Sequence, residues 1–118
     1  MENIDWQYLL FSFEGRINRA KYWLGVVAVA IVPWLFFVLA IAVNSTFLYW
    51  IAVLVSLITI WPSLAIHIKR WHDRGKSGWW ILIVFVPFIG WIWALIETGF
   101  LLGTPGPNEY GPDPLLIP

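Results

Sequence analysis

The chain has 118 residues, of which 60% are hydrophobic and only 12% are charged. A soluble domain is about half apolar and about a quarter charged, so this composition leaves too little polar surface to cover a soluble fold. The absence of cysteine excludes disulfides, thiolate metal sites and thiol nucleophiles, and a net charge of zero argues against an extended nucleic-acid surface.

Residues 1–21 form a polar head that is rich in aromatic side chains. Within it, DWQYLLFSF (residues 5–13) predicts a short helix that lies in the membrane interface, with its leucines and phenylalanines facing the lipid. Gly15 is suited to end this segment, and Asn18 is suited to cap the helix that follows.

Three long apolar segments follow, and each predicts a membrane-spanning helix: residues 22–43, 47–68 and 79–98. At 1.5 Å per residue each segment is about 27–33 Å long, enough to cross the hydrocarbon core. The first two are joined by the short turn Asn-Ser-Thr, and the last two by a polar loop, residues 69–78. The expected fold is an all-α integral membrane protein, with residues 1–118 forming a single membrane domain.

The tail, residues 103–118, is rich in proline and glycine and cannot continue a helix, so we expect an extended segment outside the bilayer. The third span has an alternative. Pro87 to Gly90 could turn the chain back on itself and make a re-entrant hairpin, which would bring the tail to the same side as the head.

The cations indicate an orientation. All seven lysines and arginines lie in the head or in the loop at residues 69–78, and none lies in the Asn-Ser-Thr turn or the tail. The positive-inside rule therefore places the head and the loop in the cytoplasm. With three spans, we expect the N-terminus to be cytoplasmic, and the C-terminus and the acidic Glu97 to lie at the outer side of the membrane.

The loop KRWHDRGKSGWW (residues 69–80) is the strongest candidate for a functional site. His72 and Asp73 could form an acid/base pair, but neighbours on a helix do not face each other, and no third catalytic group is evident. The favoured interpretation makes Asp73 a partner of Arg70 or Arg74. We expect no catalytic residue, no metal ligand and no cofactor.

The second span carries a stripe of small and hydroxyl side chains on one helix face: Ala52, Ser56, Thr59 and Ser63. Their spacing of three or four residues favours close helix–helix packing in lipid. A polar track through the membrane is the alternative, but no charged group lies in the stripe at mid-depth.

Three blocks of the chain resemble the DUF805 family of small bacterial inner-membrane proteins. They are FSFEGRINRAKYW (residues 11–23), PSLAIHIKRWHDRGKSGWW (residues 62–80) and GTPGPNEYGPDP (residues 103–114). The sequence departs from the family pattern at Lys21 and Lys69. The resemblance implies a membrane protein of uncharacterised function and supplies no catalytic residues.

Our leading hypothesis is a non-enzymatic membrane protein, a homo-oligomer whose cytoplasmic surface contacts anionic lipid head groups or a partner protein. The candidate contact residues are Arg16, Arg19, Arg70, His72, Asp73 and Arg74. The alternatives are a channel or transporter subunit that uses the polar stripe, and a lipid-phosphate enzyme with His72 as base.

Overall fold

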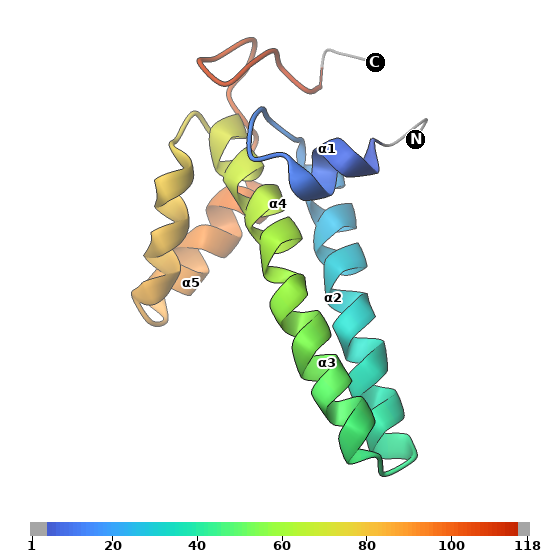
Figure 1. Cartoon of the computed structure of the whole chain (residues 1–118). Coiled ribbons are helices and arrows are strands. Elements are labelled where there is room, and N and C mark those ends of the chain that lie inside the picture. The colour runs from blue at the N-terminus through green and yellow to red at the C-terminus, as the bar shows by residue number, and fades with distance from the viewer. Residues whose placement is uncertain (1–4, 116–118) are drawn as a thin grey trace.

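The computed structural model describes residues 5–115, and this part of the chain is mainly helical (Figure 1). Its order is α1 (Trp6–Phe11), α2 (Arg19–Ala42), α3 (Thr46–Ile58), α4 (Ile60–Asp73), the 3₁₀ helix η1 (Gly78–Phe85), α5 (Ile89–Ala94) and the π-helix η2 (Leu95–Phe100). Among the described residues the only β pairing is an isolated bridge between Asn108 and Gly111.

Helices α2, α3 and α4 form a long antiparallel hairpin, which we call the arm (Figure 1). Asn44 has a positive φ of 53° in its tight turn, and Ser45 caps α3 by accepting a hydrogen bond from the Leu48 amide at 3.1 Å. The expected first span is confirmed as a helix that begins slightly earlier, at Arg19, behind the predicted cap Asn18.

The expected second span is also helical, and it extends further than the sequence indicated. Helices α3 and α4 meet at Thr59 and together run from Thr46 to Asp73, so residues 69–73 of the predicted loop are helical. The segments Arg19–Ala42 and Thr46–Asp73 are both long and apolar enough to cross a membrane.

The prediction of one continuous third span over residues 79–98 is corrected by the structure. The chain descends as η1, turns at residues 86–88 and returns as α5 and η2, which is the hairpin alternative (Figure 1). Pro87 lacks an amide hydrogen, and Phe88 has a positive φ of 65°, so a helix cannot pass through. Eight residues of η1 at about 2 Å each span about 16 Å, roughly half the hydrocarbon core.

Because this short hairpin (η1, α5 and η2) returns to its starting level, the tail lies beside the head. Figure 1 shows both described ends of the chain at the same end of the molecule, above α4. The expected separation of the tail from the head is therefore corrected. We use the name polar cap for the assembly of the head (residues 5–18), the end of α4 with the turn that follows it (residues 69–77) and the segment 97–115.

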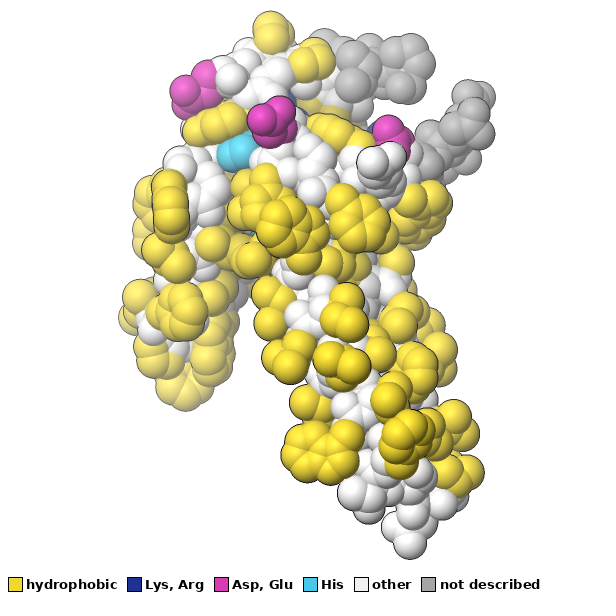
Figure 2. Space-filling view, viewed as in Figure 1, with side chains coloured by type: hydrophobic (Ala, Val, Ile, Leu, Met, Phe, Trp, Pro, Cys, Tyr) yellow, Lys and Arg dark blue, Asp and Glu magenta, His cyan; other side chains and the backbone are white. Residues whose placement is uncertain are grey.

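The buried core is small and lies under the polar cap. Leu9, Ile17, Tyr22 and Ile66 form one cluster there, and each is at most 5% exposed. By contrast, large apolar side chains are exposed along both the arm and the short hairpin (Figure 2). Such a surface needs lipid as its solvent, because exposed apolar area of this extent is unfavourable in water.

We expect Gly90→Ala to destabilise the short hairpin. A Cβ atom at this position would lie 1.8 Å from the Ile83 carbonyl oxygen in η1, so the two legs would have to separate. Overpacking of this kind costs about 1–3 kcal/mol. Thermal unfolding in detergent measures the effect, and Ile92→Ala, on an exposed position of the same helix, is the control. Equal melting temperatures for Gly90→Ala and the parent would contradict the close contact.

Candidate functional site

The polar cap is organised around the carboxylate of Asp73, the last residue of α4. Asp73 is 3% exposed, and its Oδ1 accepts a hydrogen bond from Arg16 Nε at 3.0 Å. Its Oδ2 accepts a hydrogen bond from Arg70, one helical turn earlier. Both arginines are buried as well. The predicted pairing of Asp73 with Arg70 is confirmed, and Arg16 is a partner that the sequence did not indicate.

The remaining donors of the two arginines bind backbone carbonyl groups of the C-terminal segment. Arg70 Nε donates to the Thr98 carbonyl at 2.5 Å, and Arg70 Nη2 donates to that of Leu101. Arg16 donates to three carbonyls of the tail, those of Thr104 (2.6 Å), Gly106 (2.8 Å) and Gly111 (3.2 Å). One buried carboxylate therefore positions two guanidinium groups that together hold the tail.

Other side chains complete this pattern at the end of η2. The last four carbonyls of a helix lack intrahelical partners, and basic side chains satisfy them well because they also complement the helix dipole. Here the further donors are Trp23 Nε1 to the Gly99 carbonyl (2.8 Å), Arg19 Nη1 to that of Phe100 (2.8 Å) and Arg74 Nη1 to that of Leu102. Consecutive carbonyls from residue 98 to residue 102 are thus all occupied.

Lys69 does the same for the head. Its ammonium group is fully buried and donates to the carbonyls of Leu9 (2.7 Å), Ser12 (2.6 Å) and Tyr8, at the end of α1. The charge of Lys69 therefore fixes the interfacial helix α1 against α4.

A second ion-pair cluster surrounds Glu97 in η2. The Lys76 ammonium lies 2.9 Å from Glu97 Oε1 and 2.6 Å from Oε2, and Trp93 Nε1 donates to Oε1 at 2.8 Å. Arg74 Nε lies 3.5 Å from Oε2. Glu97 was expected at the outer interface, but the returning leg of the hairpin brings it back to the polar cap.

His72 is held by packing on both sides. Its Nδ1 lies 3.0 Å from the Gly15 carbonyl oxygen, and its ring stacks on Tyr110 with 3.9 Å between centroids and 2° between planes. Its backbone carbonyl accepts a hydrogen bond from Asn108 Nδ2 at 2.9 Å. His72 thus joins the head to the tail.

The tail has its own internal support. The Asp113 carboxylate accepts hydrogen bonds from the backbone amides of Leu115 and Gly106, each at 2.9 Å, and these bonds hold the pKa of Asp113 below its ordinary value. Gly103 approaches Asp73 so closely that a Cβ atom would lie 2.1 Å from Asp73 Oδ2. The tail contains no helix, as expected, but it is not extended: turns around Gly106 and Gly111 fold it against the rest of the cap.

The structure divides the six predicted contact residues into two groups. Arg16, Arg70 and Asp73 are buried, which corrects the expectation that Arg16 and Arg70 form an exposed basic surface. Arg19 is exposed, and His72 and Arg74 are partly exposed. Sequence reasoning noted Glu97 but placed it at the outer interface, and it missed Trp93 and the carbonyl acceptors of the tail. A lone acidic residue in an apolar segment was the available signal for Glu97, since such a group needs a partner.

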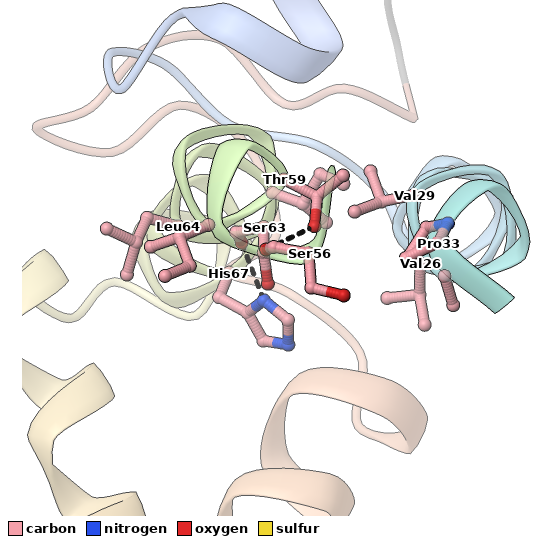
Figure 3. Close-up of a pocket in the computed structure, with 11 residues that line it drawn as sticks. Val26, Val29, Pro33, Ser56, Thr59, Ser63, Leu64 and His67 are labelled. Atoms are coloured by element: carbon pink, nitrogen blue, oxygen red, sulfur yellow. Dashed lines mark hydrogen bonds between the residues drawn. The ribbon is translucent and has the colours of Figure 1, made fainter. Parts of the chain in front are cut away.

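The predicted stripe faces α2 (Figure 3). Ala52 is fully buried, whereas Ser56, Thr59 and Ser63 line a pocket of about 360 Å³ opposite residues of α2 that include Val26, Val29 and Pro33. The hydroxyl groups of Ser56 and Thr59 donate to carbonyls of their own helix, at 2.9 and 2.8 Å, so no hydrogen bond from them crosses to α2.

These features define a class: a small helical membrane protein in which an apolar hairpin carries a polar cap held together by buried arginines. The family model described as "Protein of unknown function (DUF805)" matches residues 10–112, and the chain belongs to this family. The resemblance seen in the three sequence blocks is therefore confirmed.

Two relatives from Escherichia coli (strain K12) are similar over most of their length. Inner membrane protein YhaI is 40% identical over 103 residues, covering 87% of this chain and 86% of the relative. Inner membrane protein YhaH is 32% identical over 127 residues, covering 98% of this chain and all (100%) of the relative. No solved structure matches the chain.

We expect Asp73→Asn to release the tail and destabilise the cap. The change leaves two buried guanidinium groups without their counter-ion, and breaking a buried pair from one side costs about 3–5 kcal/mol. Thermal unfolding in detergent and limited proteolysis of residues 104–115 measure the two effects. Glu14→Gln, on the exposed surface of the head, removes the same charge elsewhere and is the control.

If Asp73→Asn does not accumulate, Gly103→Ala tests the same contact through the clash of its added methyl group with Asp73. A protease-resistant tail in both variants would show that Asp73 does not hold it.

Proposed function

We propose that this is a non-enzymatic inner-membrane protein with two membrane spans, a re-entrant short hairpin and a polar cap in the cytoplasm. The observation that carries the orientation is the position of the cations: every lysine and arginine lies in the cap or in the first turn of α2. Both similar Escherichia coli proteins, YhaI and YhaH, are named inner membrane proteins, which supports the inner membrane as the location of this chain.

The topology has a direct test, because the chain has no cysteine. Single cysteines replace Glu14 in the head, Thr46 at the far end of the arm and Glu109 in the tail, all exposed positions. With an impermeant maleimide we expect Thr46→Cys to react in intact cells, and the other two only after permeabilisation. Reaction of both Thr46→Cys and Glu109→Cys in intact cells would instead establish three full spans.

The surface that remains for anionic lipid or a partner protein is the basic rim, which we define as Arg19 and Lys21 in the first turn of α2. Arg19 is exposed and Lys21 is partly exposed, in contrast to the buried arginines of the cap. Both lie at the level where a cytoplasmic cap meets lipid head groups. Each cation near an anionic membrane surface contributes about 1 kcal/mol.

We expect the double variant Arg19→Gln/Lys21→Gln to lose about 2 kcal/mol of preference for anionic lipid, which is roughly 30-fold in relative affinity. Native mass spectrometry of protein released from mixed vesicles of phosphatidylglycerol and phosphatidylcholine counts the retained lipids. Glu14→Gln is the control for a charge change in the head, and a melting temperature reports whether the fold survives. Unchanged retention of phosphatidylglycerol in a folded double variant would leave a partner protein as the target of the rim.

We also propose that the protein is a homo-oligomer. Its cluster of large buried apolar side chains lies near the cap, Ala40 and Ala52 are the buried apolar residues further along the arm, and the apolar flanks of α2 and α3 remain open to lipid or to a second copy. Dispersion between close-packed helices is the force that such contacts use in a bilayer. The mass of the protein in mild detergent measures this property.

A channel or transporter subunit is the second candidate, favoured by the pocket between α2 and the stripe (Figure 3). Ser56, Ser63 and His67 place polar atoms along it within the apolar arm. The side-chain hydrogen bonds of Ser56 and Thr59 to their own helix count against a continuous polar path. Flux of an ion or solute in proteoliposomes would favour this candidate over the first.

A further inference from the structure

The Lys76 ammonium lies in a cage of aromatic rings with a carboxylate at its base. Its Nζ is 4.5 Å from the ring centroid of Trp80, 5.8 Å from that of Trp71 and 5.9 Å from that of Trp93. These tryptophans come from three elements, η1, α4 and α5, and Glu97 from a fourth, η2. Aromatic faces around an ammonium group are the arrangement by which proteins recognise amine and quaternary ammonium ligands.

The cage is an unusual place for a lysine that has only a structural task. Glu97 is 5% exposed, yet the side chain of Lys76 that neutralises it is 30% exposed and long enough to leave. Arg74, which also pairs with Glu97, has a side chain that is 25% exposed. The cluster thus holds two cations against one carboxylate, and both cations border on solvent or head groups.

An apolar pocket adjoins the same carboxylate. It has a volume of about 410 Å³ and is lined by one face of the returning leg of the hairpin: Ile89, Ile92, Trp93, Ile96, Glu97 and Leu101. Its polar end is Glu97, at the level of the cap, and its apolar end points toward the turn of the hairpin, where the hydrocarbon lies. The pocket therefore has the polarity of a lipid molecule.

We propose that the Glu97 cluster and this pocket bind a phospholipid whose head group carries both a phosphate and an ammonium group, as in phosphatidylethanolamine. The lipid ammonium takes the place of the Lys76 ammonium on Glu97 within the tryptophan cage. Arg74 then pairs with the phosphate, the Lys76 side chain swings out toward neighbouring head groups, and an acyl chain lies along the isoleucines. Glu97 and Arg74 each keep a partner of opposite sign.

The tryptophan cage selects this occupant over an anionic lipid, because aromatic faces attract an ammonium group. Phosphatidylglycerol offers a phosphate but no cation, so Lys76 would stay on Glu97, and the cage would contribute nothing to binding. The inference rests on the proposed position of the cap at the membrane interface.

The test uses the purified full-length protein and short-chain lipids, dihexanoyl-phosphatidylethanolamine and dihexanoyl-phosphatidylglycerol, added in detergent. Ligand that binds only the folded state raises the melting temperature. We expect phosphatidylethanolamine to stabilise the parent protein more than phosphatidylglycerol does. Equal stabilisation by the two lipids, or none by either, would overturn the proposal.

Variants of Lys76 and Glu97 test whether the Glu97 cluster is the binding site. Lys76→Met removes the competing ammonium but keeps the aliphatic stem, so we expect roughly tenfold tighter binding of phosphatidylethanolamine and no gain for phosphatidylglycerol. Methylammonium chloride should raise the melting temperature of Lys76→Met but not that of the control Lys21→Met, which lies in the rim. Glu97→Gln should abolish the preference for phosphatidylethanolamine, and a preference that survives this change would overturn the site.

The lipid-selectivity test and the topology test can fail independently of each other. If the cysteines at Glu14 and Glu109 react as expected but the two lipids stabilise equally, the proposed orientation stands and the head-group site fails. If Glu109→Cys reacts in intact cells, the orientation fails, while lipid selectivity measured in detergent still reports on the cage itself.

Discussion

The structure depends on how the backbone carbonyls at the end of η2 are satisfied. The short hairpin turns back at Pro87 and Phe88, so its last helical turn ends in the polar cap. Carbonyl groups left without partners in the buried part of this turn, at Thr98 and Gly99, would be costly. Arg19, Arg70, Arg74 and Trp23 bind the carbonyls of residues 98–102, and Arg16 continues the pattern into the tail. Asp73 offsets the cost of burying the guanidinium groups of Arg16 and Arg70, because it supplies their counter-charge.

This arrangement gives the cations two tasks. Their position at one end of the molecule supports the proposed orientation under the positive-inside rule, and their hydrogen bonds close the cap. The three sequence blocks that resemble the family meet in this closure: Arg16 comes from the first, Arg70 and Asp73 from the second, and Thr104, Gly106 and Gly111 from the third. The odd placement of a family signature in polar flanking segments is thus explained by contacts within the chain.

The sequence predicted the helical class, a short helix in the head, the two long helices of the arm and the pairing of Asp73 with Arg70, because apolar length and local spacing carry that information. It did not predict the partners of Arg16 or Lys69. Their acceptors are backbone carbonyls, which every residue has, so no side-chain pattern marks them. The prediction of one continuous third helix was wrong for another reason. Length and hydrophobicity favoured a single helix, but the chain turns at Pro87 and Phe88.

A cap that uses its buried arginines on its own backbone leaves little of its charge for recognition, and this limits where a ligand can act. Arg16 and Arg70 cannot reach a lipid without opening the structure. The cations that are at least partly exposed are Lys21 and Arg19 at the rim, and Arg74 and Lys76 beside Glu97, where carboxylate, tryptophans and an apolar pocket lie together. A site for one kind of head group is therefore expected at the root of the short hairpin, because only there do accessible charge and an apolar pocket coincide among the described residues.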